Sequence, residues 1–304
     1  MDRLTSVLTE AYVRIASNPG LEAVDWLAKE LGSSFDEAVT VGELPQFQAA
    51  CRSHPLASIF LQDPYSRRAV EKPRGYAGDA VMLDYIYRPG RSSLDGVAGV
   101  IHEATTTLPN AKSILWRQEY LASLIAQRMR EGTAIEVLSV ASGHMRELDV
   151  LPTITASRNV HFTALDTDAD SIAEAKSTYS DYNITGKVGS FATLIRDRKR
   201  SDKYELIYSA GLFDYLQDST ATALVASMYG RLKPGGVLSI GNFTRNSHGR
   251  GFMAGFMDWC LLYRDESDMR RLVDAACPKA SHRIFRDQPG NVVYLEIFAD
   301  ADDR

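Results

Sequence analysis

The chain has 304 residues, of which 45% are hydrophobic and 24% are charged, and its formal net charge is -5. This composition supplies a sizeable core and excludes a disordered chain, while the length favours two unequal domains. The acidic balance gives no general attraction for a phosphate backbone, so nucleic acid is not an expected partner.

The cysteines and the first residues indicate where the protein works. Cys51, Cys260 and Cys277 are far apart and form neither a metal-binding spacing nor a disulfide framework, which indicates a reducing compartment and no metal site. The first twenty residues include Asp2 and Glu10 and contain no uninterrupted apolar run, so neither a signal peptide nor a membrane span is expected. We predict a cytoplasmic protein, and the sequence leaves a homodimer open.

Amphipathic helices are predicted at the start of the chain. Apolar residues recur at three- and four-residue spacing over residues 4–15 and 21–31, the pattern of helices with one buried face. Turns are predicted at residues 18–20 and 32–34, where small and turn-forming residues gather.

A dense motif follows these helices. The loop Pro-Arg-Gly-Tyr-Ala-Gly-Asp at residues 73–79 precedes another apolar helix, with Asp79 as the expected N-cap and Pro89-Gly90 at the end. A long helix around residues 114–129 then leads to Glu131-Gly132, where we place a domain boundary. Residues 1–130 are therefore predicted to form a helical substrate or lid domain, and residues 131–304 a second domain.

The pattern of the second domain is different, because short β-rich runs alternate with helical ones. This alternation predicts βαβ units and a mostly parallel sheet in an α/β fold. The last two runs are separated by only four residues, too few for a crossover helix, so we expect an antiparallel hairpin. The runs, in chain order, are 134–140, 161–166, 184–189, 204–210, 236–243, 283–287 and 292–298.

A ligand site is predicted at the carboxyl end of the first two strands. The first run is followed by Ala141-Ser142-Gly143, small residues that let the backbone approach a ligand closely. The second run ends at Asp166, at the separation from Gly143 expected of an acid that binds the hydroxyls of a ribose, with Thr167 beside it. The alternative is that Asp166 or Asp168 only caps the next helix.

Two further loops extend this site. Ser190 and Phe191 follow the third run and lie either beside this ligand or in an exposed turn. After the fourth run, Ser209-Ala210-Gly211 provides small residues beside the rest of the ligand. Asp214 and Tyr215 then face either a second substrate or a structural hydrogen bond. The segment Leu-Lys-Pro-Gly-Gly at residues 232–236 is predicted as the turn before the fifth strand.

The four segments VLSVASGHMREL, FTALDTD, YELIYSAGLFDYL and LKPGGVLSIGNF resemble class I S-adenosylmethionine-dependent methyltransferases. With DPYSRRAVEKPRGYAGDAVMLDYIY at residues 63–87, the chain also resembles the bacterial 3-hydroxypalmitic acid methyl ester synthase family. The resemblance implies a Rossmann-like methyltransferase sheet, S-adenosyl-L-methionine as cofactor, and methylation of a small-molecule carboxylate. It also implies that Ser190 and Phe191 lie against the adenine of the cofactor. One departure is the turn, where Ser142 and His144 replace the cysteine and the proline or glycine of the family.

The chemical group of the methyl acceptor decides which side chains are candidates for orienting it. A carboxylate is already nucleophilic and needs a cation to orient it, for which Arg74, Arg67 and Arg245 are candidates. An amine or guanidine needs a carboxylate instead, and the candidates are Asp79, Asp84 and Asp214. His248 is a less favoured base.

The loop containing Arg74, Tyr76 and Asp79 is the expected lid over cofactor and acceptor. Two other functional classes stay open on the sequence. These are an NAD-dependent oxidoreductase, against which the lack of a GxGxxG motif argues, and a non-catalytic binding module.

Overall fold

The computed structural model describes residues 2–91, 94–129, 134–151 and 159–300. They form two compact units that do not follow a single cut in the sequence. The helical unit contains residues 1–115 and 246–260, and the sheet unit contains residues 116–245 and 261–304. The boundary expected at Glu131-Gly132 lies outside the described residues, and the roles assigned to residues 1–130 and 131–304 stay predictions.

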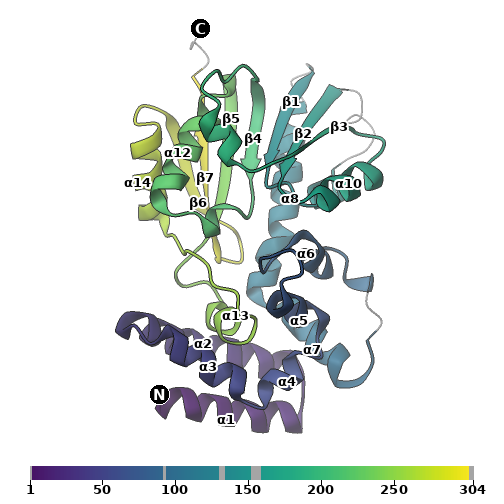
Figure 1. Cartoon of the computed structure of the whole chain (residues 1–304), viewed down its shortest axis with the longest axis vertical. Helices are drawn as coiled ribbons and strands as arrows, with labels where there is room; N and C mark the ends of the chain where they lie inside the picture. Colours follow the sequence, from purple (N-terminus) through teal and green to yellow (C-terminus); the bar gives the residue numbers. More distant parts are fainter. Residues whose placement is uncertain (1, 92–93, 130–133, 152–158, 301–304) are drawn as a thin grey trace. The chain divides into compact units, whose positions relative to one another are not determined.

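The helical unit is built from amphipathic helices, as their apolar spacing predicted (Figure 1). The first residues of α8 belong to this unit and the rest of α8 to the sheet unit. The helices are α1 Asp2–Ser17, α2 Leu21–Val41, α3 Leu44–Ser53, α4 Leu56–Phe60, α5 Pro64–Glu71, α6 Ala80–Tyr87, α7 Gly96–Thr107, α8 Pro109–Met129 and α13 Arg250–Phe256, with the 3-10 helix η1 at Pro89–Arg91.

The turn predicted at residues 32–34 was wrong, because α2 continues through them. The apolar face continues past the glycine with Phe35 and Ala38, which are buried with Leu31. Gly32 serves close packing, since a Cβ there would lie 2.9 Å from Nη1 of Arg250. Helix α13 packs against α2 and α3, so a segment from late in the chain completes the helical core.

The sheet unit contains a seven-stranded sheet in the described residues, with strand order β3-β2-β1-β4-β5-β7-β6. Neighbours from β3 to β5 pair in parallel, whereas β7 is antiparallel to both β5 and β6. The predicted methyltransferase-like sheet and its C-terminal antiparallel hairpin are confirmed. The strands are β1 Ile135–Val140, β2 Val160–Asp166, β3 Asn183–Val188, β4 Tyr204–Ser209, β5 Leu232–Phe243, β6 Ser281–Arg286 and β7 Val292–Phe298.

Helices cover both faces of the sheet (Figure 1). One core cluster joins α8 and α10 to the strands and includes Ile125 and Phe162; the other joins α12 and α14 to the opposite face and includes Leu224 and Leu295. The remaining elements of this unit are α10 Ala169–Thr178, α11 Ala192–Arg196, α12 Asp218–Tyr229, α14 Glu266–Ala276, η2 Arg146–Asp149 and η3 Phe213–Tyr215.

The start of β5 differs from the turn that the sequence predicted there. The segment 232–236 is the irregular start of β5 and not a turn before it. Tyr204 pairs with Leu232 and Leu206 pairs with Val237, so the register shifts around Gly235, whose φ is 75°.

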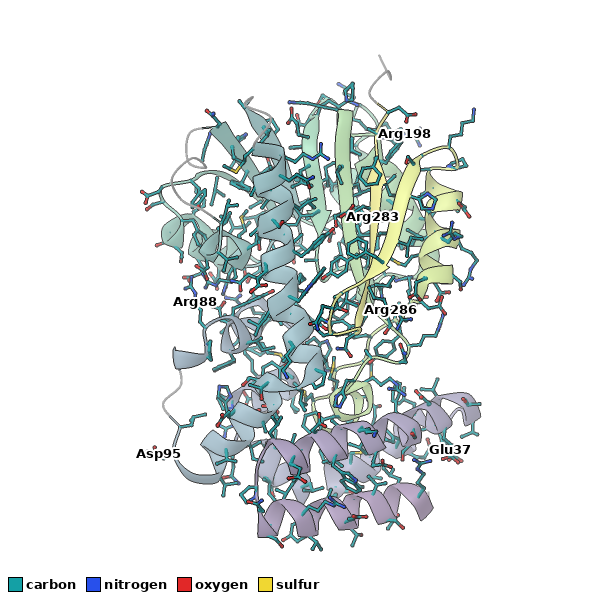
Figure 2. The ribbon with its side chains drawn as sticks, turned by 180° about the vertical axis from the view of Figure 1, so that it is seen from behind. Glu37, Arg88, Asp95, Arg198, Arg283 and Arg286 are labelled. Atoms are coloured by element: carbon teal, nitrogen blue, oxygen red, sulfur yellow. The ribbon has the colours of Figure 1, made fainter. Side chains whose placement is uncertain are left out.

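Arg283 and Arg286 lie on the outer strand β6 and are labelled in Figure 2. Arg283 pairs with the buried Glu296 of β7 at 2.8 Å. Among the described residues, no helix has the length and apolar character needed to cross a membrane.

Candidate active site

The turn after β1 has an unusual backbone. Ala141, Gly143 and Met145 have φ values of 55°, 52° and 53°, in the left-handed region that only glycine enters without strain. The turn is fixed by a hydrogen bond from the Ser142 amide to the Leu165 carbonyl of β2, at 3.2 Å. In the described residues the turn is followed by the short 3-10 helix η2.

Asp166 connects this turn to the end of β2. Its Oδ2 accepts a hydrogen bond from the Gly143 amide at 2.8 Å, and its Oδ1 accepts one from the Asp168 amide at 2.9 Å. The helix cap belongs to Asp168, whose carboxylate accepts the Asp170 and Ser171 amides at the start of α10. A carboxylate has about four acceptor positions. Asp166 therefore keeps capacity for the hydroxyls of a ligand while the backbone holds it in place.

The loop after β3 lies beside Asp166. The Gly189 amide donates to the Asp166 carbonyl at 2.7 Å, which brings Ser190 and Phe191 to the same edge of the sheet. The Ser190 hydroxyl accepts the Ala192 amide at 3.2 Å and so begins α11, while Phe191 is half-buried against the core on the α12 side. Both residues thus have structural contacts, and their contact with an adenine stays a prediction, as does that of the exposed Thr167.

The loop after β4 completes this edge. The Ser209 hydroxyl donates to the Val140 carbonyl at 2.9 Å, which ties the ends of β4 and β1 together. Arg117 of α8 donates from Nη1 to the Ala210 carbonyl at 2.9 Å, and a Cβ on Gly211 would lie 3.4 Å from that nitrogen. The structure therefore brings the four predicted loops together at the carboxyl edge of the sheet.

Asp214 lies in η3 and is nearly fully buried, at 4% exposure. Its Oδ1 accepts the Phe243 amide at 2.7 Å, and its carbonyl accepts the Leu262 amide at 2.7 Å. The structural hydrogen bond, one of the two roles left open by the sequence, is therefore present. Burial raises the pKa of Asp214 to about 7, against the opposing influence of the Phe243 amide and of Arg117. Tyr215 beside it is exposed.

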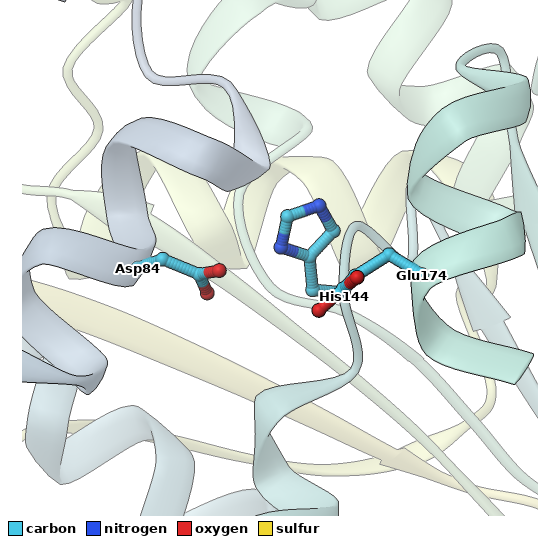
Figure 3. A group of neighbouring side chains, drawn as sticks. All are labelled: Asp84, His144 and Glu174. Atoms are coloured by element: carbon cyan, nitrogen blue, oxygen red, sulfur yellow. The ribbon is translucent and has the colours of Figure 1, made fainter. Parts of the chain in front are cut away.

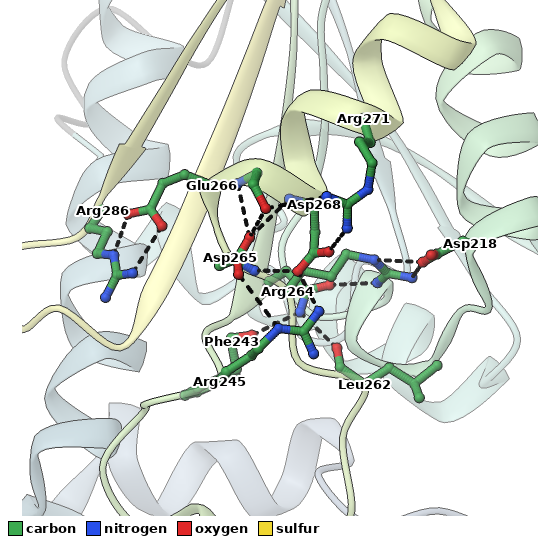
Figure 4. Close-up of polar contacts among 12 residues, drawn as sticks. Asp218, Phe243, Arg245, Leu262, Arg264, Asp265, Glu266, Asp268, Arg271 and Arg286 are labelled. Atoms are coloured by element: carbon green, nitrogen blue, oxygen red, sulfur yellow. Dashed lines mark hydrogen bonds and ion pairs between the residues drawn. The ribbon is translucent and has the colours of Figure 1, made fainter.

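A buried arginine fixes the loop that contains Asp214 (Figure 4). Arg264 donates from Nη1 to the Phe213 carbonyl at 2.7 Å and to Asn242 Oδ1 at 2.8 Å, and from Nη2 to the Leu216 carbonyl. It also pairs with Asp218 at 2.7 Å. The backbone of η3 is thereby attached to the end of β5, which fixes the position of Asp214.

The sequence analysis did not identify a second polar group, which lies close to the turn after β1. Tyr208 of β4 donates its hydroxyl to Glu147 of η2, and both side chains are buried. Burial raises the pKa of the Glu147 carboxyl, against the lowering influence of the Tyr208 hydroxyl and the Arg117 charge. Arg117 itself, at 8% exposure, was not identified either, because one charged residue in a helical pattern ordinarily indicates an exposed position.

The residue after Gly143 belongs to a further network. Arg146 donates from Nη2 to Glu174 at 2.9 Å and contacts His144 Nδ1 at 3.1 Å, and His144 and Glu174 are drawn together in Figure 3. Because an arginine can only donate, Nδ1 of His144 is the acceptor and the proton of its neutral ring resides on Nε2. The histidine that departs from the family pattern is thus fixed in orientation.

The predicted lid residues belong to the helical unit. Asp79, at 1% exposure, accepts Nε of Arg68 at 2.8 and 3.0 Å and the Met82 amide at 2.8 Å, which confirms it as the N-cap of α6. Tyr76 is 37% exposed and Arg74 is half-buried. The position of Asp79 is thus structural, and the participation of these three residues in catalysis stays a prediction.

The other cationic and acidic candidates have varied surroundings. Arg67 is exposed and donates to the Leu61 carbonyl at 2.7 Å, while Asp84 is buried in α6. Arg245 pairs with Asp268 at 2.6 Å, which raises the pKa of its guanidinium. His248 lies 3.1 Å from Asp25, and burial lowers its pKa despite this carboxylate. Arg245 and His248 therefore each have a partner within their own unit.

Comparison with known families decides the chemistry of this edge. Residues 137–236 match a family model described as a methyltransferase domain, a range that includes the glycine turn, Asp166 and the loop after β4. This chain is an S-adenosylmethionine-dependent methyltransferase. A search of curated proteins finds no match to the sequence of the methyltransferase.

Solved structures share the fold of this methyltransferase. A possible exported protein from Bordetella parapertussis is 17% identical, with a TM-score of 0.61 over 99% of this chain and 96% of that one. The CurJ carbon methyltransferase is 12% identical, with a TM-score of 0.54 over 96% of this chain and 70% of that one. At these identities the likeness concerns the fold.

The residues at the edge fit S-adenosylmethionine. Asp166 has a carboxylate with unused acceptor capacity at the end of β2, and Gly143 has no side chain. The Ser142 hydroxyl is buried and has no hydrogen-bond partner in the described part of the chain. Buried hydroxyls normally have a partner, so a polar ligand group beside Ser142 accounts for it.

The raised pKa of Asp214 predicts a pH dependence of stability. Because the carboxyl titrates near 7 in the folded state and near 3.8 when unfolded, the folded state binds its proton more tightly between these values. This contribution is full below 3.8 and is lost as the pH rises toward 7. We expect Asp214→Asn, which keeps an oxygen for the Phe243 amide, to flatten this part of the urea-midpoint profile between pH 4 and 8. A profile identical to that of the wild type would contradict the assignment.

Proposed function

We propose that the methyltransferase methylates a carboxylate oxygen of a small molecule, a hydroxy fatty acid or a related metabolite. The observation that carries this proposal is the charge balance beside the cofactor loops. Arg117 is buried and always charged, whereas burial raises the pKa of Asp214 to about 7 and also raises that of Glu147. In the weakly acidic range, where Asp214 is protonated, the fixed charge of Arg117 therefore favours an anionic acceptor.

The proposed chemistry needs no general base. A carboxylate has a pKa near 4 and is a ready nucleophile at neutral pH. The bound cofactor supplies an electrophilic methyl group on a sulfonium. The protein has to hold the acceptor oxygen in line with that group and to exclude water. Asp166 and the turn at Gly143 would hold the nucleoside, and a cation would orient the carboxylate.

We assign the lid role to the loop at residues 73–79. Asp79 fixes the end of this loop by capping α6 and pairing with Arg68. The loop backbone turns through Gly75 and Gly78, with φ values of 88° and 78°. Arg74 would orient the acceptor carboxylate, and Tyr76 would donate its hydroxyl to it.

The second candidate is N-methylation of an amine or guanidine. The observation in its favour is again Asp214, because a carboxyl that titrates near 7 is suited to remove a proton at neutral pH. The two candidates differ in what Asp214→Asn does. An ester-forming enzyme keeps its rate, whereas loss of a general base lowers turnover roughly 100-fold or more.

The deciding experiment uses methyl-labelled S-adenosylmethionine and a metabolite extract, read by mass spectrometry. The labelled product is then treated with mild base, which releases methanol from a methyl ester and leaves an N-methyl group intact. A label that is released by base, together with an active Asp214→Asn variant, supports the proposal. Base-stable label that disappears in Asp214→Asn establishes the second candidate instead.

Arg74, the cation of the proposed lid, is expected to contribute to binding of the acceptor. Replacing Arg74 by Gln removes a charged hydrogen-bond donor worth about 1.5–3 kcal/mol, so we expect the KM for the acid to rise at least tenfold. Arg14→Gln is the matched control, since Arg14 lies in the same unit and its guanidinium contacts Glu10 and the ring of Trp26. Steady-state kinetics measure both. An unchanged KM in Arg74→Gln would remove Arg74 from the acceptor site.

We also propose that the enzyme works in the cytoplasm. Cys260 is an exposed free thiol, and Cys51 and Cys277 are buried free thiols. Free thiols persist in a reducing compartment. The homodimer stays a prediction.

A further inference from the structure

A small open pocket lies among helices α1, α2 and α3 of the helical unit. These helices contact one another (Figure 1), and residues of all three, with the turn that joins α2 to α3, line the pocket. Its cavity volume is about 40 Å³, which is room for a few groups of the size of a water molecule. No residue of its lining was a candidate for the cofactor or the methyl acceptor.

The turn between α2 and α3 brings an acidic residue to the pocket. Helix α2 ends at Val41, and Gly42 adopts the left-handed conformation that terminates many helices, with a φ of 76°. The Glu43 amide then donates to the Ala38 carbonyl at 2.7 Å. This bond fixes Glu43 beside the last turn of α2.

The walls of the pocket are apolar. Leu4 of α1, Ala38 of α2 and Phe47 of α3 are buried, whereas Val41 lies exposed at the rim. The ring of Phe47 is fixed by Phe35, which it contacts edge-to-face at a centroid distance of 6.0 Å. Apolar walls with a small number of polar groups are typical of sites for small molecules.

One of the polar groups is a buried serine. Ser34 of α2 lines the pocket and is 5% exposed, and its Oγ has no hydrogen-bond partner in the part of the chain that the structure describes. A serine inside a helix can donate to the carbonyl four residues earlier, but Ser34 does not use this option. Because buried hydroxyls nearly always have a partner, the Ser34 side chain points to a polar ligand group in the pocket.

The other two polar groups are carboxylates. Glu37, which is labelled in Figure 2, and Glu43 are exposed and line the same pocket as Ser34. Glu37 follows Ser34 by three residues and therefore lies next to it on the surface of α2. Over the described ranges, no side chain forms an ion pair or a hydrogen bond with either carboxylate. The lining includes no basic residue, so the pocket is negatively charged.

We propose that this pocket binds a small primary alkylammonium ion. An alkylamine is protonated at neutral pH, as the lysine side chain is. Its three N–H donors match the acceptors of Ser34, Glu37 and Glu43, and the apolar walls accommodate a short alkyl stem. The carboxylates would repel an anion. This second ligand site goes beyond the proposed function and does not depend on which acceptor is methylated.

The test compares three probes on the full-length protein. The probe n-propylammonium has the charge, the donors and the stem, whereas 1-propanol lacks the charge and trimethylpropylammonium lacks the N–H donors. Binding is measured from the methyl resonances of Leu4 and Val41. We expect propylammonium to bind at least about tenfold more tightly than either control, the effect of one hydrogen bond between charged groups.

Two substitutions separate ligand binding from a structural role. Ser34→Ala removes a hydroxyl that has no partner, so we expect an unchanged or slightly higher urea midpoint and about fivefold weaker binding of propylammonium. Glu37→Gln should weaken binding about threefold, the effect of one exposed ion pair. The matched control is Glu22→Gln, which removes an exposed carboxylate of the same helix outside the pocket and should leave binding unchanged.

Several outcomes would overturn the inference. Resonances that propylammonium does not move would show that the pocket does not take the ion. Equal affinity for 1-propanol or for trimethylpropylammonium would show that the charge or the donors are not recognised. A loss of stability in Ser34→Ala would assign the hydroxyl to the helix, and equal binding by Glu37→Gln and Glu22→Gln would place the ion elsewhere. Methyl transfer is not measured in this experiment, so each of these results leaves the proposed function standing.

Discussion

Asp166→Ala is expected to weaken the binding of S-adenosylhomocysteine by about 100-fold. The substitution removes two charge-assisted hydrogen bonds to the ribose, each worth roughly 1.5 kcal/mol, and about 1.4 kcal/mol corresponds to a tenfold change in affinity. It also releases the Gly143 amide, which Asp166 accepts at 2.8 Å, so the glycine turn loses an anchor. Isothermal titration measures the dissociation constant directly.

The neighbouring aspartate provides the control for this experiment. Asp168 caps α10 through the Asp170 and Ser171 amides, so Asp168→Ala should cost about 1 kcal/mol of stability and change the affinity less than threefold. If the two variants bind equally well, Asp166 does not hold the ribose, and the location of the cofactor at this edge has to be abandoned.

Arg264→Met is expected to destabilise the sheet unit by about 3 kcal/mol. The methionine fills most of the space, but the carbonyls of Phe213 and Leu216 and the amide oxygen of Asn242 lose their donor. Each buried acceptor left without a partner costs roughly 1 kcal/mol or more. Native-state hydrogen exchange of the β5 amides reports this free energy without requiring the two units to unfold together.

An exposed arginine of the same region is the matched control. Arg271 of α14 pairs with Asp268 at the surface (Figure 4), and its side chain is 67% exposed. Surface pairs of this kind contribute about 0–1 kcal/mol, so Arg271→Met should leave hydrogen exchange nearly unchanged. Equal effects of the two substitutions would show that the buried contacts of Arg264 do not stabilise η3.

The strands and their mostly parallel pairing could be predicted from the sequence because each strand leaves a local pattern. Short β-rich runs alternated with helices, and four residues between the last two runs allowed only a hairpin. Gly32 shows the limit of such reasoning. A glycine near small polar residues ordinarily marks a turn, but here Gly32 lies within α2 and provides room for Arg250, which comes from more than two hundred residues later.

The backbone of the site was predictable and its buried charges were not. Small residues at the ends of β1 and β4 and the acid at the end of β2 have a local signature, and the structure joins these segments by hydrogen bonds. Arg117 and Arg264 leave no such signature, because a buried arginine depends on carbonyls and acids supplied by distant segments. The position of the buried His102 in the helical unit likewise depends on Asp63, which lies 39 residues earlier in the chain.

The separation of the helical unit into two stretches of sequence has a consequence for synthesis on the ribosome. Helix α13 buries Phe252 and Phe256, and a Cβ on Gly255 would lie 2.7 Å from the sulfur of Cys51 in α3. The first 115 residues emerge early but have to wait for this helix, which is translated only after five strands of the sheet. A nascent chain stopped before residue 250 would expose the apolar surface that α13 covers, and chaperones would be expected to bind there.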